Sequence, residues 1–320
     1  MAANPNSITI ASTIDKNYLV PLGVTAHSLL NSKESASRID WFVFESGIPH
    51  AARTEFEHFF EGSDITFHWI PCSQTRLGNL PLWGRAVPVM YQRLVIADFF
   101  PVDLKTILYL DADLLVLGDV EELFAVDLGD MAVGAVQDMA IPTVSSPLGL
   151  SRWKAMGVPA DARYFNAGVL LMNLAVWRKE CISDRMLSYL ETASTVAMMD
   201  QDALNALLYL SWKPLHYRWN VIGSMAGRRF FKPKDLDPKQ YIEAVENPGI
   251  VHFGGYLKPW VISRLGNRWD VRYKHFLSRQ GIGSAYDTGL KSTLYSLYDR
   301  HFRQIGYPLE RAVWSRLREF

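Results

Sequence analysis

The sequence predicts an α/β fold in which a mostly parallel sheet is flanked by helices. Strand-like apolar segments alternate with segments of helical spacing from residue 7 to about 117. This order is typical of a parallel sheet wound by crossover helices. The stretch at 106–117 is apolar and rich in branched residues, as in a strand that is buried on both faces. Hydrophobic residues make up 49% of the 320 residues, which is ample for a core.

The individual elements follow from the same patterns. In the first half we expect strands at 8–12, 39–44 and 65–70 and a further strand that leads to Asp111 and Asp113, and helices at 19–30, 49–60 and 90–99. In the second half we expect strands at 132–136 and 164–172, an edge strand at 215–220, a helix at 174–190 and another that begins near residue 200. The segment 141–157 is rich in Ser, Pro and Gly, which is typical of a binding loop or lid.

Composition narrows the class of protein. Thirty-three Lys and Arg balance 33 Asp and Glu, which argues against binding of nucleic acid through bulk charge. The two cysteines, Cys72 and Cys181, are too few for a disulfide framework or a thiolate metal site and fit a reducing compartment. The first residues have no signal-peptide pattern, and no apolar run reaches the roughly 18 residues of a membrane span. We therefore expect a cytoplasmic protein.

Two aspartates, Asp111 and Asp113, interrupt the apolar stretch at 106–117. Unpaired carboxylates are costly inside a sheet, so we place both at the end of a strand, where the sheet opens. Residues i and i+2 of an extended segment project to the same side. Both side chains therefore direct oxygen to one point, and a divalent cation is the simplest ligand. Turns and helix caps also contain such Asp-x-Asp pairs.

His252 follows a second short apolar run at 250–251 and is expected to reach the same crevice. Two carboxylates and one imidazole suit a six-coordinate cation, and the nitrogen favours Mn²⁺, with Mg²⁺ as the second choice. A histidine on its own would more readily be a core residue that is bonded to backbone.

Gly255 and Lys258 offer what a diphosphate needs. Glycine lets backbone approach a ligand closely, and lysine is a point charge for phosphate oxygens. A Gly-Gly turn and a solvated lysine are the structural alternative. No Gly-x-Gly-x-x-Gly follows the first strand, so a dinucleotide-type phosphate loop is not predicted.

Three further polar residues are candidates for a site. Asp200 opens a predicted helix and is either its N-cap or part of a site. Gln201 follows it in an otherwise apolar region. Asn166, at the mouth of a buried strand, is either a strand-end cap or a contact to a hydroxylated ligand.

Four sequence blocks occur together in a familiar order. They are Leu-Tyr-Leu-Asp-Ala-Asp at 108–113, Phe-Asn-Ala-Gly-Val-Leu-Leu-Met-Asn-Leu at 165–174, Asp-Gln-Asp-Ala-Leu-Asn at 200–205, and His-Phe-Gly-Gly-Tyr-Leu-Lys-Pro-Trp at 252–260. Over about residues 7 to 260 the chain resembles glycosyltransferase family 8, and especially the bacterial lipopolysaccharide galactosyl- and glucosyltransferases.

The resemblance implies a GT-A-type Rossmann-like fold and transfer of a hexose from UDP-galactose or UDP-glucose to a hydroxyl of a glycan acceptor. It also implies Mn²⁺ and retention of anomeric configuration, in the synthesis of lipopolysaccharide or another surface polysaccharide. By position, the implied metal ligands are Asp111, Asp113 and His252. The implied substrate-binding residues are Ala11, Asp15, Asn17 and Tyr18 around the uridine, Arg93, Asp111, Ala112 and Asp113 along the donor, and Gly255 and Lys258 at the diphosphate. The residues implied at the reaction centre are Asn166, Asp200 and Gln201. The first loop, at 11–18, is one residue longer than expected, which makes Asp15 the least secure of these assignments.

Two routes to retention stay open. In a double displacement Asp200 or Gln201 would be the nucleophile. In same-face attack by the acceptor Gln201 would only stabilise the reacting centre, and we favour this route. Two other classes use similar residues. One is a sugar-nucleotide-binding protein without turnover, and the other is a metal-dependent phosphohydrolase or nucleotidyltransferase.

The composition changes after residue 260. We expect a nucleotide-sugar domain at 1–260 and a helical tail at 261–320, where 11 Lys and Arg exceed 5 Asp and Glu and alternate with aromatic residues. This tail is either a solvated helical cap over the core or a surface that docks at the inner face of an anionic membrane, where the acceptor would be linked to lipid.

Overall fold

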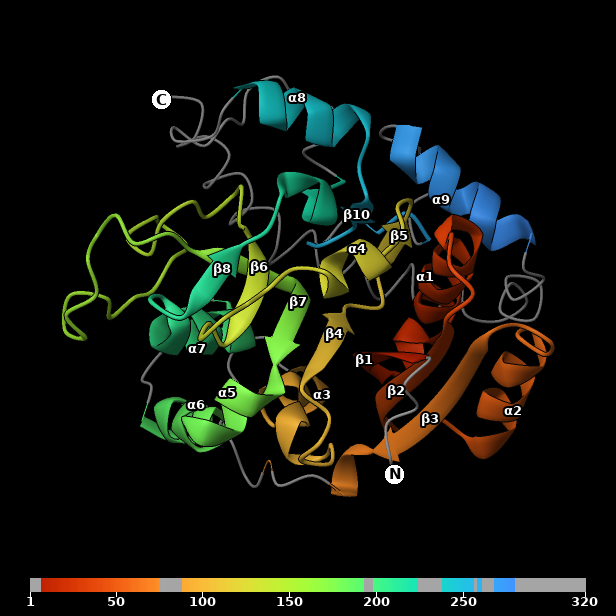
Figure 1. The fold of residues 1–320 in the computed structure, drawn as a ribbon, viewed down its shortest axis with the longest axis horizontal. Coiled ribbons are helices and arrows are strands. Elements are labelled where there is room, and N and C mark those ends of the chain that lie inside the picture. The colour runs from red at the N-terminus through yellow and green to blue at the C-terminus, as the bar shows by residue number, and fades with distance from the viewer. Residues whose placement is uncertain are drawn as a thin grey trace, which may run out of the picture.

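A seven-stranded sheet forms the centre of the molecule (Figure 1). The computed structural model describes residues 7–74, 77, 88–192, 198–223, 238–255, 258–260 and 268–279. In spatial order the strands are β3 (Ile65–Pro71), β2 (Arg38–Ser46), β1 (Ser7–Asp15), β4 (Thr106–Leu110), β7 (Phe165–Asn173), β6 (Val133–Gln137) and β8 (Trp212–Pro214). The predicted α/β class is therefore confirmed.

The order in which strands are added to the sheet reverses at β1, between β1 and β4. Strands β3, β2, β1 and β4 are parallel to their neighbours, whereas β7 is antiparallel to both β4 and β6. From β1 the chain moves outward to β2 and β3, and it then returns to place β4 on the other side of β1. In open α/β sheets such a switch point creates a crevice outside the carboxyl ends of the strands, where ligands bind.

A second, three-stranded sheet lies next to this crevice. It consists of β5 (Leu114–Val116), β10 (Ile250–His252) and β9 (Val221–Ile222), with β10 in the middle. Both aspartates were predicted at the end of a strand, and β4 does end at Leu110, directly before Asp111. The chain leaves the large sheet after Leu110 and joins the small sheet at Leu114, because the acidic turn between them cannot be buried among paired strands.

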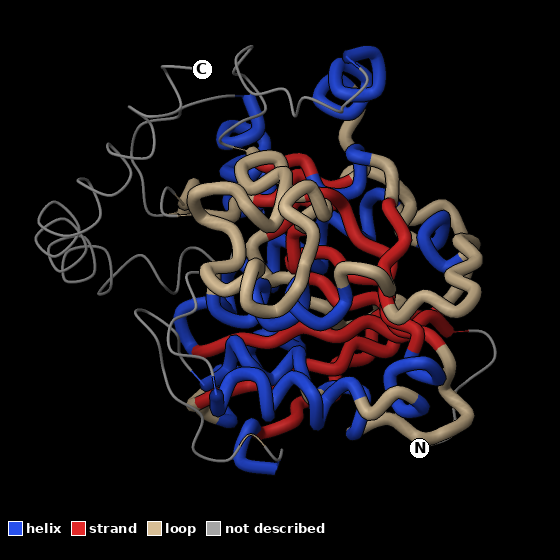
Figure 2. Tube along the Cα trace, turned by 90° about the vertical axis from the view of Figure 1, so that its left-hand side faces the viewer, coloured by secondary structure: helices blue, strands red, loops and turns tan. Residues whose placement is uncertain are grey.

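Helices lie on both sides of the strand layer (Figure 2). They are α1 (Leu19–Ser32), α2 (His50–His58), α3 (Pro88–Tyr91), α4 (Glu121–Phe124), α5 (Leu174–Lys179), α6 (Ile182–Thr192), α7 (Met199–Leu208), α8 (Pro238–Glu246) and α9 (Arg268–Arg279). Alternate residues of the strands face two different cores. Phe42 and Tyr109 belong to the core under α5, α6 and α7, whereas Trp41 and Leu108 belong to the core under α1 and α2.

Three predicted elements differ from the structure. The helix expected at 90–99 is the short α3 followed by two 3₁₀ turns, Gln92–Leu94 and Ile96–Asp98. The helix expected at 174–190 is divided into α5 and α6 at Cys181, whose φ is +49°. The edge strand expected at 215–220 is instead a 3₁₀ helix, Tyr217–Asn220, and the edge of the sheet is β8.

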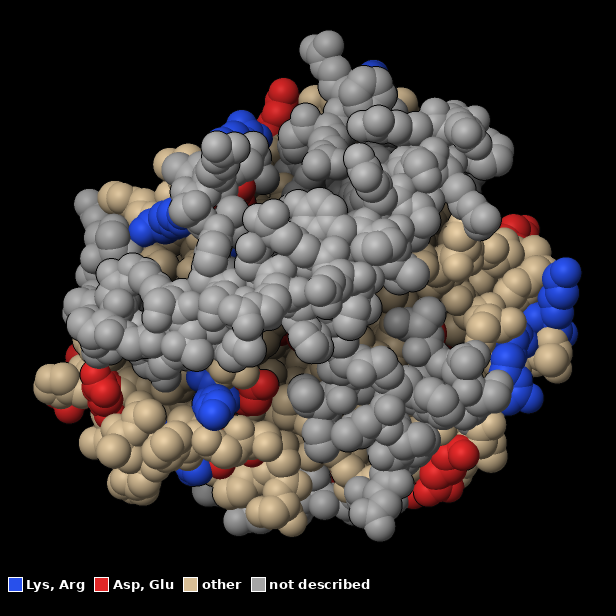
Figure 3. Space-filling view, turned by 180° about the vertical axis from the view of Figure 1, so that it is seen from behind, with Lys and Arg blue, Asp and Glu red and all other residues tan. Residues whose placement is uncertain are grey.

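Helix α9 is the part of the predicted tail that the structure describes. Its residues Trp269 and Tyr273 are buried in one cluster with Val24 of α1 and Val251 of β10, so the aromatic residues of this helix complete a core. The rest of 261–320 lies outside the described residues, and the boundary at residue 260 stays a prediction. On the face seen in Figure 3, the described basic and acidic side chains are interspersed.

Thr25 of α1 binds the backbone of the acidic turn, residues 111–113, between β4 and β5. The Oγ1 atom of Thr25 lies 2.7 Å from the carbonyl oxygen of Ala112 and 3.0 Å from that of Leu114, and it accepts a hydrogen bond from the N–H of Leu114. This hydroxyl is completely buried. It thus satisfies the backbone exactly where the chain passes from one sheet to the other.

We expect Thr25→Val to lower the free energy of unfolding by about 1–3 kcal/mol, because an isosteric methyl group leaves buried backbone groups without partners. Denaturant unfolding measures the change. Thr54→Val is the matched control, since Thr54 makes the same local bond to the carbonyl four residues earlier, on an exposed helix face. Equal losses for the two variants would contradict the role of Thr25.

Candidate active site

Three potential metal ligands converge at the switch point. Asp111 follows β4, Asp113 precedes β5, and His252 ends β10, which pairs with β5 so that His252 lies opposite Leu114. One ligand atom from each of the three lies within 4.8 Å of the others. Within the described part of the chain this is the one cluster of three or more such residues. The predicted convergence of two strand ends therefore occurs.

The two aspartates use their oxygens in the same way. The Oδ1 of Asp111 accepts a hydrogen bond from Tyr109 and pairs with Arg93 at 2.9 Å, whereas its Oδ2 lies 3.7 Å from His252 Nε2. The Oδ2 of Asp113 pairs with Lys258, whereas its Oδ1 lies 3.4 Å from His252 Nε2. Each carboxylate thus has one oxygen bound by a cation of the protein and one oxygen facing the histidine.

Arg93 joins the metal cluster to helix α7. Its guanidinium is buried, pairs with Asp111 and with Asp200 (2.8 Å), donates to the carbonyl of Ala167, and lies 4.6 Å from the ring centroid of Tyr109. Burial would lower the pKa of Arg93, but the two carboxylates outweigh burial and raise the pKa. This arginine therefore stays charged and holds two acidic residues of different elements together.

Lys258 lies beside Asp113 and is nearly buried. Its ammonium group also donates to the carbonyl of Phe253, and it lies 5.8 Å from the ring centroid of Tyr18 and 5.5 Å from that of Trp260. Burial would lower the pKa of Lys258, but the charge of Asp113 raises it. The alternative of a solvated lysine does not hold. Burial also raises the pKa of Tyr18, to about 12, although Lys258 opposes this rise.

The Asp113 carboxyl is held ionised by its neighbours. Burial would raise its pKa, but the charge of Lys258 and the close contact with His252 lower the pKa well below the ordinary value. The low pKa means that Asp113 is an anion over the whole range in which the protein would work.

A bulge in β7 brings backbone close to these side chains. The pairing of β6 with β7 shifts from Ala135–Leu170 to Val136–Asn166. In the bulged segment the N–H of Ala167 donates to Gln201 Oε1, and the carbonyl of Gly168 accepts from the N–H of Asp111. A Cβ on Gly168 would lie 2.3 Å from Cε1 of His252, so only glycine fits against this ring.

Of the three residues predicted at the reaction centre, Asn166 and Gln201 share the partner Asp138, whereas Asp200 pairs with Arg93. Asn166 and Gln201 both donate to Oδ2 of Asp138, and the N–H groups of Ala140 and Ile141 donate to its Oδ1. Asp200 lies in the first turn of α7, after the N-cap residue Met198, and pairs with Arg93. The interpretation of Asp200 as an N-cap is therefore wrong.

The other predicted substrate-binding residues differ in their location and exposure. Ala11 is buried in β1, and Ala112 is buried between the two aspartates. Asp15 ends β1 and accepts a hydrogen bond from the N–H of Asn17 (2.8 Å). Gly255 is exposed with φ +90°, a conformation that favours glycine. The contacts proposed for these residues with a donor stay predictions.

Sequence reasoning missed Tyr109, Asp138, Gly168 and Asn220. Tyr109 and Gly168 lie inside the recognised blocks at 108–113 and 165–174, and the glycine in a strand was a signal for close backbone approach. Asp138 and Asn220 stand outside every block and carried no signal of their own.

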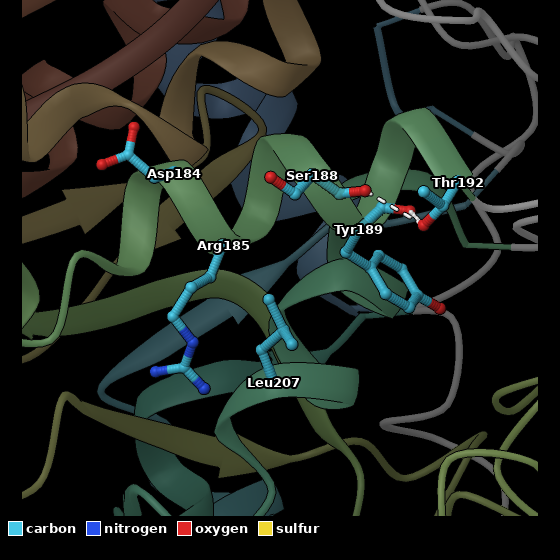
Figure 4. A pocket seen from close by; sticks show the side chains of 6 residues that line it. All are labelled: Asp184, Arg185, Ser188, Tyr189, Thr192 and Leu207. Carbon is cyan, nitrogen blue, oxygen red and sulfur yellow. Dashed lines mark hydrogen bonds between the residues drawn. The ribbon is translucent and has the colours of Figure 1, made fainter.

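A groove of about 490 Å³ lies elsewhere, between α6 and α7 (Figure 4). It is lined by Asp184, Arg185, Ser188, Tyr189, Thr192 and Leu207. None of these is among the predicted site residues. We assign the chemistry to the cluster at the switch point, because charged side chains converge there and do not in the groove.

The fold and this cluster define a class, the GT-A glycosyltransferases, in which a Rossmann-like sheet carries an Asp-x-Asp pair. The chain belongs to glycosyl transferase family 8, whose family model matches residues 9–262. It is a hexosyltransferase, and the family implies a sugar-nucleotide donor and a glycan acceptor.

Curated relatives agree with this family. General stress protein A of Bacillus subtilis is 29% identical over 273 residues, which are 84% of this chain and 92% of that protein. Lipopolysaccharide 1,3-galactosyltransferase of Salmonella typhimurium is 27% identical over 81% of this chain and 74% of its own length. The lipopolysaccharide glucosyltransferase WaaO of Escherichia coli is 29% identical over 79% and 72%.

Solved structures agree as well. The galactosyltransferase LgtC, in complex with donor and acceptor sugar analogs, is 26% identical with a TM-score of 0.70, over 85% of this chain and 96% of LgtC. The predicted GT-A fold is thereby confirmed. In the described part of the chain, no helix combines the length and the apolar character needed to cross a bilayer.

Asp200 gives a pH-dependent prediction. Burial raises the pKa of Asp200 from 3.8 to about 6, although Arg93 opposes the rise. Between these values the folded state binds the proton more tightly than the unfolded state, so this residue's contribution to stability is full at low pH and is lost as pH rises through about 6. We expect Asp200→Asn to lack this loss. The stability difference between the variant and wild type should therefore change by about 2–3 kcal/mol from pH 4 to pH 7, measured by urea unfolding. Parallel pH curves would contradict the assignment.

Proposed function

We propose that this protein transfers a hexose from UDP-galactose or UDP-glucose to a hydroxyl of a glycan acceptor, with retention of configuration and with Mn²⁺ as cofactor. The observation that carries the proposal is the convergence of Asp111 Oδ2, Asp113 Oδ1 and His252 Nε2 beside the buried Lys258. A site with three cation ligands next to a lysine suits a diphosphate that leaves as an anion.

The residues present fit a divalent cation. Two carboxylate oxygens and one imidazole nitrogen are ligands of the kind that Mn²⁺ prefers, and Mg²⁺ is the second choice. The other oxygens of Asp111 and Asp113 are bound by Arg93 and Lys258, which leaves the inner ones for a metal. When bound, the metal would act as a Lewis acid for the departing diphosphate.

The donor would extend from the first loop to helix α7. Ala11, Asp15, Asn17 and Tyr18 would surround the uridine, and Tyr18 supports this proposal because its ring already lies near Lys258 and Trp260. Lys258 would place its charge on the diphosphate, and the exposed Gly255 and the buried Ala112 would let backbone approach it.

At the reacting centre we propose roles for Arg93, Asp200, Gln201 and Asn166. Arg93 would hold Asp200 against the sugar through the ion pair that it already makes. The Gln201 oxygen accepts a bond from Ala167, and its amide donates to Asp138. An amide that is bonded at both ends is a poor nucleophile, which supports same-face attack by the acceptor over a double displacement.

The acceptor is proposed from the relatives. Several of them are named as lipopolysaccharide galactosyl- or glucosyltransferases, so we propose a glycan of lipopolysaccharide or of another surface polysaccharide.

Family membership disfavours a phosphohydrolase or a nucleotidyltransferase. A sugar-nucleotide-binding protein without turnover would differ by failing to release UDP.

We expect Asp113→Asn to reduce hexose transfer at least a hundredfold in saturating Mn²⁺, because the variant loses a charged ligand and the partner of Lys258. Release of UDP from UDP-galactose and UDP-glucose measures this, with and without acceptor. Excess EDTA should stop the wild-type reaction, and Asp130→Asn, at an exposed position, should leave it unchanged. Full turnover in EDTA would refute the metal-dependent reaction.

We propose further that the tail contacts an anionic membrane. Helix α9 exposes Val271 and Arg272, whereas its residue Tyr273 is buried. A cation near an anionic surface contributes about 1 kcal/mol.

Arg272→Glu should therefore weaken binding to vesicles that contain phosphatidylserine by about tenfold or more, as measured by co-sedimentation. Arg38→Glu, at the exposed start of β2, should bind like wild type. Equal binding to neutral and anionic vesicles would contradict this proposal.

A further inference from the structure

Asn220 forms a bridge between the potential metal ligand His252 and the bulged strand β7. It ends the 3₁₀ helix Tyr217–Asn220 and is almost completely buried. Its Oδ1 lies 3.0 Å from Nδ1 of His252, and its Nδ2 donates to Oδ1 of Asn166 at 2.9 Å. Both ends of the amide are therefore engaged, and one of them touches the imidazole on the side away from Asp111 and Asp113.

The hydrogen bonds of Asn166 determine which amide atom of Asn220 faces His252. The carboxylate of Asp138 only accepts, so the atom of Asn166 that faces it is the amide nitrogen. The N–H of Gly168 only donates, so the atom of Asn166 that faces it is the oxygen. That same oxygen faces Asn220, which must therefore present its amide nitrogen there and its oxygen to His252. An oxygen next to Nδ1 requires a proton on Nδ1.

We infer that Asn220 is a positioning residue that keeps the proton of His252 on Nδ1, so that the lone pair of Nε2 faces Asp111 and Asp113. The inference rests on the proposed metal site and deepens it. Asn220 is not one of the proposed metal ligands, and it acts through the histidine.

Without a partner on Nδ1, the carboxylates of Asp111 and Asp113 would draw the proton of His252 to Nε2. Nε2 of His252 lies 3.4 Å from Asp113 and 3.7 Å from Asp111, and negative oxygens at these distances favour a proton on Nε2. A proton there would have to leave before Nε2 binds a cation. The oxygen of Asn220 offers the proton a partner on the opposite nitrogen. Metal-binding histidines commonly have such a partner, and its loss weakens metal affinity by about 10–100-fold.

The surroundings prevent the ring from compensating by rotation. Gly168 packs against the imidazole so closely that a methyl group would lie 2.7 Å from Nδ1. The series of hydrogen bonds that begins at His252 ends at Asp138. The carboxylate of Asp138 accepts hydrogen bonds from the backbone N–H groups of Ala140 and Ile141 at the start of the long loop. The tautomer of the histidine is thus fixed by three consecutive hydrogen bonds that end on Asp138, whose carboxylate is itself held by two backbone N–H groups.

The first test measures affinity for Mn²⁺ alone by electron paramagnetic resonance. We expect Asn220→Ala to bind Mn²⁺ about 10–100-fold more weakly than wild type. Asn220→Asp keeps an acceptor for Nδ1 but places an oxygen against the oxygen of Asn166. We therefore expect it to bind Mn²⁺ within a few-fold of wild type while its unfolding temperature falls. Asn173→Ala, at the far end of β7, removes a helix cap and should leave the affinity unchanged.

The second test reads the tautomer without metal. In protein labelled with ¹⁵N-histidine, at a pH where the imidazole is neutral, the ring-nitrogen shifts of His252 should report Nδ1–H in wild type and Asn220→Asp. Asn220→Ala should show a large fraction of Nε2–H. If Asn220→Ala retains both Nδ1–H and full Mn²⁺ affinity, the inference is overturned. If wild type binds no Mn²⁺, the proposed cofactor fails, and the tautomer measurement still decides the role of Asn220.

Discussion

The structure depends on buried or partly buried carboxylates that are paired with buried or partly buried cations. Asp111 and Asp113 lie within one short turn, and their mutual repulsion would be severe in a crevice with little water. Arg93 binds one oxygen of the first, and Lys258 binds one oxygen of the second. These two pairs place a cation against each acid and also orient both acids, because the oxygen that remains on each is directed to His252. Removal of either cation would leave an uncompensated charge, which is far costlier than the loss of a surface ion pair.

The irregular backbone around the acids is satisfied by side chains. The bulge in β7 takes Ala167 out of the regular ladder, and Gln201 and Arg93 bind its N–H and carbonyl. Thr25 does the same for the turn between the aspartates. Polar residues that look like candidates for chemistry therefore also complete the hydrogen bonding of an irregular region, and the two roles support each other. A site that is preorganised in this way needs little rearrangement when a ligand enters.

Much of the fold was predictable because its signals are local. Alternation of strand and helix, and the apolar runs before Asp111 and His252, indicated the parallel sheet and the meeting of two strand ends. The errors arose where tertiary packing outweighed local preference. Residues 215–220 are aromatic and strand-like, yet they form a 3₁₀ helix whose Trp219 and Asn220 are buried. Asp138 and Asn220 could not be predicted, because their importance arises from contacts with residues 28 and 32 positions away.

The division of the ligands between two sheets has a mechanical consequence. Asp111 extends the large sheet, whereas Asp113 and His252 belong to the borders of the small one. An ion bound by all three residues would connect the two sheets. A shift of one sheet relative to the other would change the distances between the ligand atoms. The affinity for the ion and the rigidity of the contact between the two sheets would therefore depend on each other.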